Sequence, residues 1–573
     1  MPREIITFEN VSFTYPTRKG PSLSNVSFVI HEGDFVLVTG STGCGKTTLL
    51  KMLNGIIPHL SKGTPGGRAV IAGLDAKHAG MEALTKEVGL IFQNPNDQIV
   101  SNSVEEEIAF GLENLGLSDA EIRERITWAC EQVSISDLRE RDPNSLSGGQ
   151  KQRVVIASQV AMRPRILAFD EPLSSLDPRC AGEVTQCIAR LNRRGITIVM
   201  VEHRIGFVAP YCSHVLVLDQ GALVEFAPRD ESFMHPRDVF GAHGLEIPPE
   251  VHICRHTGGR KLTFDEAELA DHVRRWHTAV SPEEKSFYNP PDTVRAVSGE
   301  VTVRIENVTF GYAKSRTVLN ECSLTVHRGE TIALMGANGT GKSTLLSLIA
   351  GLIRPDKGEI IVNGIETGSL GAKKRASLLG FLIQNPDLML FCDTVREELA
   401  FGPRHVRRTR ADIDGAIAAI LAFLNLSPQQ NLPPFTLSMG QRLRAALGAV
   451  LSLQPRILLL DEPTTGQNKE NIRRLMETLA QLEHIDTIIF CTHDFETAIE
   501  HADRIAVLHG GRVAADCAPA EIFEHPELLR NAGLQMPLTT RLAHSLGLPA
   551  PLRLPHEFSK ALQTRSAFHP AGA

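Results

Sequence analysis

The sequence lacks long apolar runs and paired cysteines. No apolar stretch in its 573 residues approaches the ~18–20 residues that a membrane-spanning helix needs. The opening stretch, MPREIITFEN, lacks the apolar run of a secretion signal. The ten cysteines are scattered from Cys44 to Cys517, with no C-x-x-C pair and no metal-like spacing, so neither a zinc site nor a disulfide framework is expected. We expect buried or incidental thiols in a reducing, cytosolic compartment.

An excess of positive charge is also missing. Lys and Arg number 59 against 66 Asp and Glu, which gives a net charge of −7. This balance argues against nucleic-acid binding through bulk electrostatics, although it leaves room for a local basic patch. With 42% hydrophobic and 22% charged residues, the composition is that of a soluble globular protein with more than one core. At roughly 150 residues per domain, the length predicts three or four compact units or two large ones.

Repeated motifs divide the chain into two copies. Lys46 and Lys342 are 342 − 46 = 296 residues apart, whereas Gln93 and Gln384 are 384 − 93 = 291 apart. The difference lies in a loop that is longer in the first copy (57–73) than in the second (353–364). The sequence therefore predicts a duplicated domain. Five motif pairs recur in the same order: FENVSFTY (8–15) and IENVTFGY (305–312), GSTGCGKTTLL (40–50) and GANGTGKSTLL (336–346), IFQNPNDQIV (91–100) and LIQNPDLMLF (382–391), SLSGGQKQR (145–153) and TLSMGQRLR (436–444), and PRILAFDEP (164–172) and PRILLLDEP (455–463).

Each copy has the pattern of an α/β domain. Short β-rich runs such as DFVLVTG and ILAFD alternate with longer helical patterns such as AEIRERITWACEQV. This alternation predicts a mostly parallel sheet covered by helices. We expect a first domain at 1–245, a linker with one short helix at 246–300, a second domain at 301–535 and a weakly ordered tail at 536–573.

A G-x-x-x-x-G-K-[ST] motif occurs in each copy, after an apolar strand and at the start of a helix. In such a P-loop the backbone N–H groups and the helix dipole favour phosphate, the lysine reaches the β- and γ-phosphates, and the hydroxyl can ligate Mg²⁺. Both copies are therefore predicted to bind nucleotide. The candidate residues are Gly40, Ser41, Thr42, Gly43, Cys44, Gly45, Lys46, Thr47 and Thr48, and Gly336, Ala337, Asn338, Gly339, Thr340, Gly341, Lys342, Ser343 and Thr344.

An Asp-Glu pair ends an apolar run in each copy, at Asp170-Glu171 and at Asp461-Glu462. An aspartate at the end of a buried strand can hold Mg²⁺ through water, and the next carboxylate projects towards the γ-phosphate. Each copy thus supplies the second part of a nucleotide site.

The stretch LSGGQKQR (146–153), upstream of the first Asp-Glu pair, resembles the signature of ATP-binding cassette (ABC) ATPases. P-loop, Q-loop, signature, Walker B, D-loop and switch histidine follow in the family's order in both copies, over nearly the whole chain except the linker and tail. The resemblance implies ATP hydrolysis with Mg²⁺. It also implies that each copy carries an antiparallel β subdomain and a helical subdomain with the signature.

The resemblance assigns roles to matching positions. In the family, an aromatic residue stacks on adenine, the Q-loop glutamine touches Mg²⁺ and the attacking water, a glutamate polarises that water, and a switch histidine contacts the γ-phosphate. The matching residues are, in that order, Tyr15 and Tyr312, Gln93 and Gln384, Glu171 and Glu462, and His203 and His493. The implied metal ligands are Thr47, Gln93 and Asp170, and Ser343, Gln384 and Asp461.

In the family two cassettes face head to tail, so that each ATP lies between one P-loop and the partner's signature. Hydrolysis then removes contacts that held the halves together. One implied site combines residues 40–47, Gln93, Asp170, Glu171 and His203 with Ser438, Met439, Gly440 and Gln441. The other combines residues 336–343, Gln384, Asp461, Glu462 and His493 with Ser147, Gly148, Gly149 and Gln150.

Two departures from the family pattern affect the second copy. Met439 replaces a glycine of the signature, which predicts a looser first composite site. The first D-loop ends at Asp177, whereas Gln467 and Asn468 stand in its place in the second copy. Because both catalytic glutamates are present, we predict that both sites hydrolyse ATP, at unequal rates.

The segments 92–117 and 383–403 resemble the ATPase components of energy-coupling factor (ECF) importers, the cobalt/nickel and B-vitamin uptake class. The resemblance lies in QNP followed by V-x-E-E-[IL]-AFG, and in VEHRIGFV around His203. Ser103 with Glu106, and Thr394 with Glu397, form S/T-x-x-E capping patterns that predict a helix start after each Q-loop. The resemblance implies a peripheral protein on the cytoplasmic face of the membrane. Its expected partners are a transmembrane coupling subunit and a separate membrane substrate-binding subunit, with no nucleic acid and no zinc.

Two other classes remain open at this point. Soluble tandem ABC ATPases that act on ribosomes carry a long charged helical linker, but 246–300 holds 7 Lys and Arg against 10 Asp and Glu, which suits RNA phosphates poorly. A tandem ATPase of a sugar-type importer is the closer alternative, although its sequence after the Q-loop would differ. DNA-repair ABC ATPases insert zinc modules rich in cysteine pairs, and the sequence has none.

Overall fold

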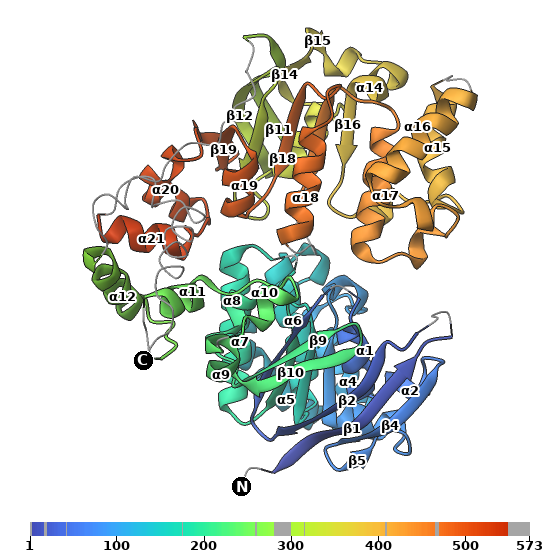
Figure 1. The fold of residues 1–573 in the computed structure, drawn as a ribbon, viewed down its shortest axis with the longest axis vertical. Helices are drawn as coiled ribbons and strands as arrows, with labels where there is room; N and C mark the ends of the chain where they lie inside the picture. The colour runs from blue at the N-terminus through green and yellow to red at the C-terminus, as the bar shows by residue number, and fades with distance from the viewer. Residues whose placement is uncertain are drawn as a thin grey trace. The chain divides into compact units, whose positions relative to one another are not determined.

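The computed structural model describes residues 3–16, 20–41, 43–174, 176–235, 237–257, 261–279, 299–313, 316–406, 410–463 and 469–547. The chain forms two compact units, whose described parts are 3–279 and 299–547 (Figure 1).

The first unit combines two sheets. The first is antiparallel, in the order β2 (Leu23–His31), β1 (Glu4–Thr14), β4 (Thr64–Ile71) and β5 (Leu74–Asp75). The second runs β10 (Ala222–Pro228), β9 (His214–Asp219), β3 (Phe35–Gly40), β8 (Thr197–Val201), β7 (Ile166–Asp170) and β6 (Val88–Ile91). Its strands are parallel except β10, which runs antiparallel to β9. Helices and both sheets give the α/β fold that the sequence predicted.

The burial pattern of the strands distinguishes the antiparallel sheet from the mostly parallel one. Strand β1 buries most of its apolar residues, and Ile6, Phe8 and Phe13 join a core with Leu49 and Leu53 of the first helix. Every residue of β3 is buried, as expected for a central parallel strand covered on both faces. The helices of this unit are α1 (Lys46–Leu53), α2 (Ile56–His59), α3 (Met81–Glu87), α4 (Val104–Asn114), α5 (Asp119–Val133), α6 (Gly148–Ala161), α7 (Pro178–Arg193), α8 (Ile205–Val208), α9 (Arg229–Met234), α10 (Val239–Ala242), α11 (Pro249–His256) and α12 (Glu266–Ala279).

Helices α4, α5 and α6 pack together as the helical part that carries the signature motif. Helix α4 begins where the capping pattern predicted, because the Ser103 side chain accepts a hydrogen bond from the Glu106 backbone N–H. In the second unit Thr394 caps its helix in the same way. The predicted helix starts after both Q-loops are therefore confirmed.

The second unit repeats this architecture. Its antiparallel sheet is ordered β12 (Arg316–His327), β11 (Val301–Ala313), β14 (Lys357–Val362) and β15 (Ile365–Glu366). The main sheet is ordered β20 (Arg512–Cys517), β19 (Arg504–His509), β13 (Thr331–Met335), β18 (Thr487–Cys491), β17 (Ile457–Asp461) and β16 (Leu379–Leu382). The matching helices, from α15 (Val395–His405) to α17 (Met439–Leu451), stand beside β16 (Figure 1). Its helices are α13 (Lys342–Ile349), α14 (Ala372–Leu378), α15 (Val395–His405), α16 (Arg410–Phe423), α17 (Met439–Leu451), α18 (Lys469–Ala480), α19 (Phe495–His501), α20 (Pro526–Asn531) and α21 (Leu538–Ser545).

The repeat extends past the boundaries that the sequence suggested. Residues 239–256 and 528–545, which we call the C-terminal segments, share a G-L-x-x-P pattern at a spacing of 533 − 244 = 289. In both, a left-handed glycine (Gly244, φ 65°; Gly533, φ 71°) ends one helix, and the next begins after a proline. The following leucine N–H donates to the carbonyl five residues back, 2.9 Å away in each case.

The sequence-based description of the linker and tail is wrong in two places. The described part of 246–300 forms two helices, α11 and α12, rather than one short helix. Within 536–573, residues 538–545 form α21, with Leu542 and Ala543 fully buried, so this part of the tail is packed and ordered. Residues 280–298 and 548–573 lie outside the described residues.

Two sequence-based exclusions can be compared with the structure. Among the described residues, no helix is both long enough and apolar enough to cross a bilayer. The ten cysteines, from Cys44 to Cys517, all lie in the described part of the chain and are free thiols.

Candidate functional site

The first P-loop joins β3 to α1 and depends on glycine at two positions. Gly40 (φ 150°) lies so close to the next strand that a Cβ would sit 2.0 Å from the Leu218 carbonyl oxygen. At Gly45 (φ 108°) a Cβ would sit 2.3 Å from the Ser22 carbonyl oxygen. Only glycine tolerates both this backbone conformation and this approach. Thr42, one of the predicted nucleotide-binding residues, lies outside the described residues.

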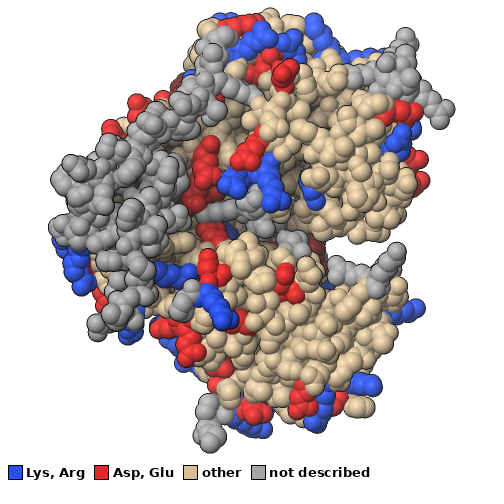
Figure 2. Space-filling model, viewed as in Figure 1, with Lys and Arg blue, Asp and Glu red and all other residues tan. Residues whose placement is uncertain are grey.

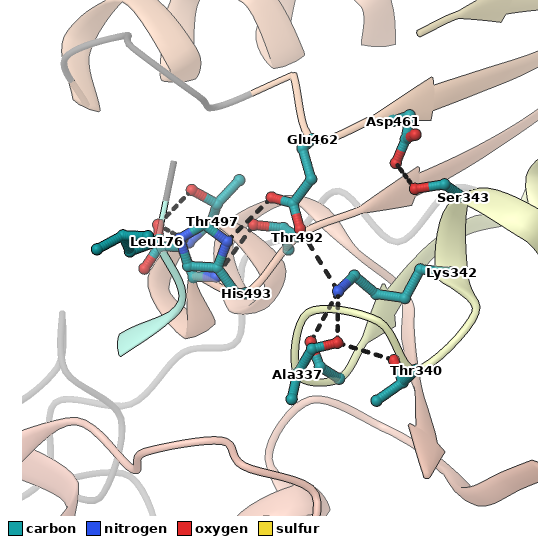
Figure 3. A network of polar contacts seen from close by, with 12 residues as sticks. Leu176, Ala337, Thr340, Lys342, Ser343, Asp461, Glu462, Thr492, His493 and Thr497 are labelled. Atoms are coloured by element: carbon teal, nitrogen blue, oxygen red, sulfur yellow. Dashed lines mark hydrogen bonds and ion pairs between the residues drawn. The ribbon is translucent and has the colours of Figure 1, made fainter. Parts of the chain in front are cut away.

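The P-loop lysines are buried and are held by their own loops. Lys46 Nζ donates to the Gly40 and Ser41 carbonyls at 2.8 and 3.0 Å. Lys342 Nζ donates to the Gly336 and Ala337 carbonyls at 2.8 and 3.2 Å (Figure 3). A buried ammonium at a helix N-terminus, in a loop rich in N–H groups, forms an anion site.

An open pocket of ≈ 290 Å³ lies over the first P-loop, and Tyr15 forms part of its wall. The Tyr15 hydroxyl lies 3.4 Å from Thr48 Oγ1, and the Tyr312 hydroxyl lies 3.2 Å from Thr344 Oγ1. Each tyrosine also packs its ring edge-on against the phenylalanine two residues before it in the chain. Both rings are thus fixed beside the P-loop helix. The lining consists of Tyr15, Ser22, Gly43, Gly45, Lys46, Thr47, Thr48, Glu171 and His203.

The Walker B aspartates face the P-loop hydroxyls. Thr47 donates to Asp170 at 3.2 Å, and Ser343 donates to Asp461 at 3.0 Å. Burial, reinforced by the neighbouring Glu171, raises the pKa of Asp170 to about 6, and burial also raises the pKa of Asp461. A carboxylate whose negative charge is poorly compensated, next to a hydroxyl, is the kind of hard oxygen pair that Mg²⁺ prefers. The residues therefore fit this ion.

The glutamate after each aspartate is the centre of a polar network. Glu171 accepts from Gln93 Nε2 at 3.0 Å and lies 3.1 Å from His203 Nε2. Burial alone would raise its pKa, but the hydrogen bond and charge of His203 and the charge of Lys46 outweigh burial, so the pKa of Glu171 is lowered. The backbone of Glu171 is left-handed (φ 48°), a costly conformation that proteins retain mostly at functional sites.

The second unit has the same polar network except that its glutamine, Gln384, does not contact the glutamate. Glu462 lies between His493 Nδ1 at 3.0 Å and Lys342 Nζ at 3.7 Å (Figure 3). These two groups outweigh burial and lower the pKa of Glu462, whose φ is 49°. Gln384, by contrast, is exposed and has no hydrogen-bond partner among the described residues. The structure thus brings Gln93 to its glutamate but leaves Gln384 apart from Glu462.

The signature serines begin helices α6 and α17. Ser147 and Gln150 exchange hydrogen bonds in a capping box, with the Gln150 side chain accepting from Ser147 N–H at 2.9 Å. Ser438 and Gln441 do the same at 3.0 Å. Met439, which replaces the glycine, is the first residue of α17 and leaves this cap unchanged.

The first D-loop aspartate has a structural contact of its own. Asp177 is buried and caps α7, where its side chain accepts from the Cys180 N–H at 2.8 Å. Its counterparts Gln467 and Asn468 lie outside the described residues.

Two residues flanking the first switch histidine were missed by the sequence analysis. Glu202 is 1% exposed, and its carboxylate accepts from the backbone N–H groups of Leu173, His203 and Arg204 at 3.2, 2.8 and 3.0 Å. Arg204 donates to the carbonyls of Leu173 and Leu176 at 2.9 and 2.7 Å. Together they tie the switch histidine to the segment that leads from Glu171 to the D-loop. The second unit has Thr492 and Asp494 at these positions.

We expect Glu202→Gln to lower ATP turnover by the first P-loop site about tenfold. The amide oxygen can still accept from His203 and Arg204, but its NH₂ group would face the Leu173 N–H and leave that donor unpaired. Turnover would be measured in a Glu462→Gln background, which isolates the first glutamate. Thr492→Ser, tested in a Glu171→Gln background, is the matched control and should change little. Equal effects of the two substitutions would contradict the prediction.

Comparison with known proteins identifies the family. A family model described as ABC transporter matches residues 23–174 and 319–465, together more than half of the chain. The chain belongs to the ABC transporter family. ABC proteins of this kind are ATPases, so ATP hydrolysis is the activity of this chain.

Relatives of this ABC protein share its tandem length. A protein of Methanosarcina mazei is 40% identical over 95% of this chain and 94% of the relative. A protein of Enterococcus faecalis is 33% identical over 97% and 98%. Both are named in general terms as ABC transporter ATP-binding proteins. Among solved structures, cbiO1 of Clostridium perfringens, described as part of the ABC transporter complex cbiONQ, is 28% identical over 44% of this chain and 100% of its own, with a TM-score of 0.38.

Proposed function

We propose that this chain is the fused ATPase pair of an energy-coupling factor type importer. It would work as a peripheral protein on the cytoplasmic face of the membrane, with a transmembrane coupling subunit and a separate substrate-binding subunit. The observation that carries the proposal is the segment after each Q-loop, whose V-x-E-E-[IL]-AFG pattern resembles that class.

The second glutamate of this pattern accepts two backbone hydrogen bonds from the preceding loop in both units. Glu107 is buried and accepts from the backbone N–H groups of Val100 and Ser101 at 2.9 and 3.0 Å. Glu398 accepts from the N–H groups of Phe391 and Cys392, both at 2.8 Å. A buried carboxylate would be costly without such partners, so these bonds fix the loop before α4 and α15.

The fixed loop holds apolar side chains in solvent. Val100 is 68% exposed in the first unit, and Phe391 is 61% exposed in the second. Phe391 packs edge-on against Phe401 of α15, with ring centroids 4.8 Å apart, and Phe401 is itself exposed. A rigid, exposed apolar ledge is suited to docking a helix of a membrane subunit.

The catalytic roles follow from the contacts in each unit. Lys46 and Lys342 would bind the β- and γ-phosphates, and Tyr15 and Tyr312 would stack on adenine. Glu171 and Glu462, held deprotonated by their histidines and lysines, would accept a proton from the attacking water. His203 and His493 would contact the γ-phosphate, and Gln93 and Gln384 would orient the water.

The magnesium site would be formed by Thr47, Gln93 and Asp170 in the first unit and by Ser343, Gln384 and Asp461 in the second. When bound, Mg²⁺ would neutralise negative charge on the β- and γ-phosphates. We propose further that the signature of each half completes the pocket of the other, through Ser147 to Gln150 and Ser438 to Gln441.

The distribution of charge gives no support to the ribosomal alternative. On the face shown in Figure 2, described Lys and Arg residues lie among Asp and Glu residues, and the chain as a whole carries a net charge of −7. A protein that binds RNA phosphates concentrates basic residues on one surface.

The docking proposal predicts loss of membrane association on substitution of the ledge. We expect Phe391→Ser combined with Phe401→Ser to release the chain from membranes that contain the coupling subunit. ATP hydrolysis by the purified chain should change less than twofold, because neither residue contacts the P-loop network. Val301→Ser, at an exposed apolar position of β11, is the control and should leave association intact. The measurement is co-purification of the chain with a candidate coupling subunit that is expressed together with it. Turnover stimulated by ribosomes, without membrane association, would overturn the proposal.

A further inference from the structure

The C-terminal segment of each unit is linked to the second residue of that unit's own P-loop, directly in the second unit and through Asp219 of β9 in the first. In the second unit the Ala337 N–H donates to the Ala532 carbonyl at 3.1 Å. Gly533 lies against the same residue, since a Cβ at Gly533 would sit 2.9 Å from Ala337 Cβ.

The first unit makes the equivalent contact through side chains. Ser41, which corresponds to Ala337, donates its hydroxyl to Asp219 at 2.8 Å. The other oxygen of Asp219 lies 3.3 Å from Nδ1 of His243, and His243 corresponds to Ala532 in the repeat. The same two positions are thus joined in both units, by a backbone hydrogen bond in one and by a hydroxyl–carboxylate–imidazole chain in the other. The side chains at these two positions differ between the units, yet the positions remain linked in both. Packing of the fold alone would not require such a link.

The contacted residue holds the phosphate-binding lysine. Ser41 and Ala337 are the residues whose carbonyls accept from Lys46 and Lys342 at 3.0 and 3.2 Å. One residue, Ala337, therefore lies between the C-terminal segment and the buried ammonium group in the second unit, and two residues, Asp219 and Ser41, lie between them in the first.

Both C-terminal segments are packed in the core of their unit and can therefore restrain the residues that they contact. Phe240 is fully buried and stacks on Phe233, with ring centroids 5.0 Å apart. Leu529, Ala532 and Leu534 belong to the main core of the second unit. A segment anchored in the core at one end and bonded to the P-loop at the other restrains the loop.

We propose that each C-terminal segment is a positioning element for its own P-loop and sets the affinity of that site for MgATP. Asp219 and His243 act as positioning residues in the first unit, and the Ala532-Gly533 pair acts in the second. The inference requires nucleotide binding at the P-loops but not the importer assignment, so it stands or falls independently of the membrane partner.

The repeat provides a matched pair of substitutions for the test. Gly533→Ala and Gly244→Ala place the same methyl group at the same repeat position, with nearly equal backbone strain (φ 71° and 65°). Only at Gly533 does the methyl group meet the P-loop, because a Cβ at Gly244 has nothing within 4 Å. The difference between the two variants therefore isolates the contact.

The experiment measures binding of a fluorescent ATP analogue with Mg²⁺ to the full chain. Gly533→Ala is tested in a Lys46→Ala background, which leaves the second P-loop intact, and Gly244→Ala in a Lys342→Ala background. We expect Gly533→Ala to raise Kd up to about tenfold, the equivalent of one hydrogen bond, and Gly244→Ala to leave Kd unchanged. In turnover assays Gly533→Ala should raise KM more than it lowers kcat.

A second variant is needed if a thermal melt shows that Gly533→Ala is not folded. Asp219→Asn, in the Lys342→Ala background, removes the carboxylate that lies between Ser41 and His243 without adding volume and should also raise Kd. Equal shifts for the two glycine variants would overturn the proposal. So would a fall in kcat at unchanged Kd, which is the signature of a smaller active fraction, or an unchanged Kd for Asp219→Asn.

Discussion

Replacing Glu171 and Glu462 together by glutamine should reduce steady-state ATP hydrolysis by at least about 100-fold while nucleotide binding persists. Both carboxylates have a lowered pKa, and glutamine keeps their size but cannot accept a proton. General-base catalysis of this kind contributes about 10²–10⁴-fold. Phosphate release would measure hydrolysis, and binding of a fluorescent ATP analogue would show that the pockets remain intact. Turnover within tenfold of the unsubstituted chain would remove both residues from the mechanism.

The single substitutions should leave different residual activities. Glu171 is bonded to Gln93, whereas Glu462 is paired with Lys342 and Gln384 is apart from it. The two glutamates thus have different hydrogen-bond and charge partners before nucleotide binds. We expect Glu171→Gln and Glu462→Gln to retain unequal turnover, and equal values would contradict the predicted inequality.

Combining P-loop and signature substitutions should reveal which motifs share a pocket. In the proposed arrangement Lys46 works with Ser438, and Lys342 works with Ser147. We therefore expect Lys46→Met with Ser438→Arg to behave like Lys46→Met alone, because both changes fall on one site. Lys46→Met with Ser147→Arg damages both sites and should lower turnover at least tenfold further.

The equivalent combinations at the second P-loop serve as the control. Lys342→Met with Ser147→Arg should resemble Lys342→Met alone, and Lys342→Met with Ser438→Arg should be the more severe combination. The reverse pattern, with same-half pairs behaving as one site, would show that each half completes its own pocket.

Much of the site could be predicted because its chemistry depends on short contiguous motifs. Gly40 and Gly45 must be glycine for steric reasons, and Ser103 and Thr394 mark helix starts through local hydrogen bonds. The repeated motifs predicted two copies of one domain, and the alternation of β-rich runs with helical patterns predicted the α/β fold, which the sheet orders confirm.

What sequence reasoning missed depends on burial and on distant partners. Glu107 and Glu202 look like ordinary surface carboxylates in the sequence, yet both are buried and bonded to backbone N–H groups of other segments. Helices α11 and α21 are only eight residues long, and helices this short form mainly because the core covers one face. Their one sequence signal was the repeated G-L-x-x-P, which is too brief to recognise without the fold.

The extended repeat determines where the two halves can be separated experimentally. A cut at residue 245 would sever Phe240 and its buried neighbours from Val251, Ile253 and Cys254, and a C-terminal truncation at 535 would strip Leu542 and Ala543 from the second half. Both fragments would expose apolar surface and aggregate, which could be mistaken for mutual dependence of the halves. Dissection after residue 279, which keeps the buried Leu269 and Val273 of α12, and retention of the chain to at least 547 avoid that artefact. Only fragments with these limits give a fair measure of what one cassette can do unaided.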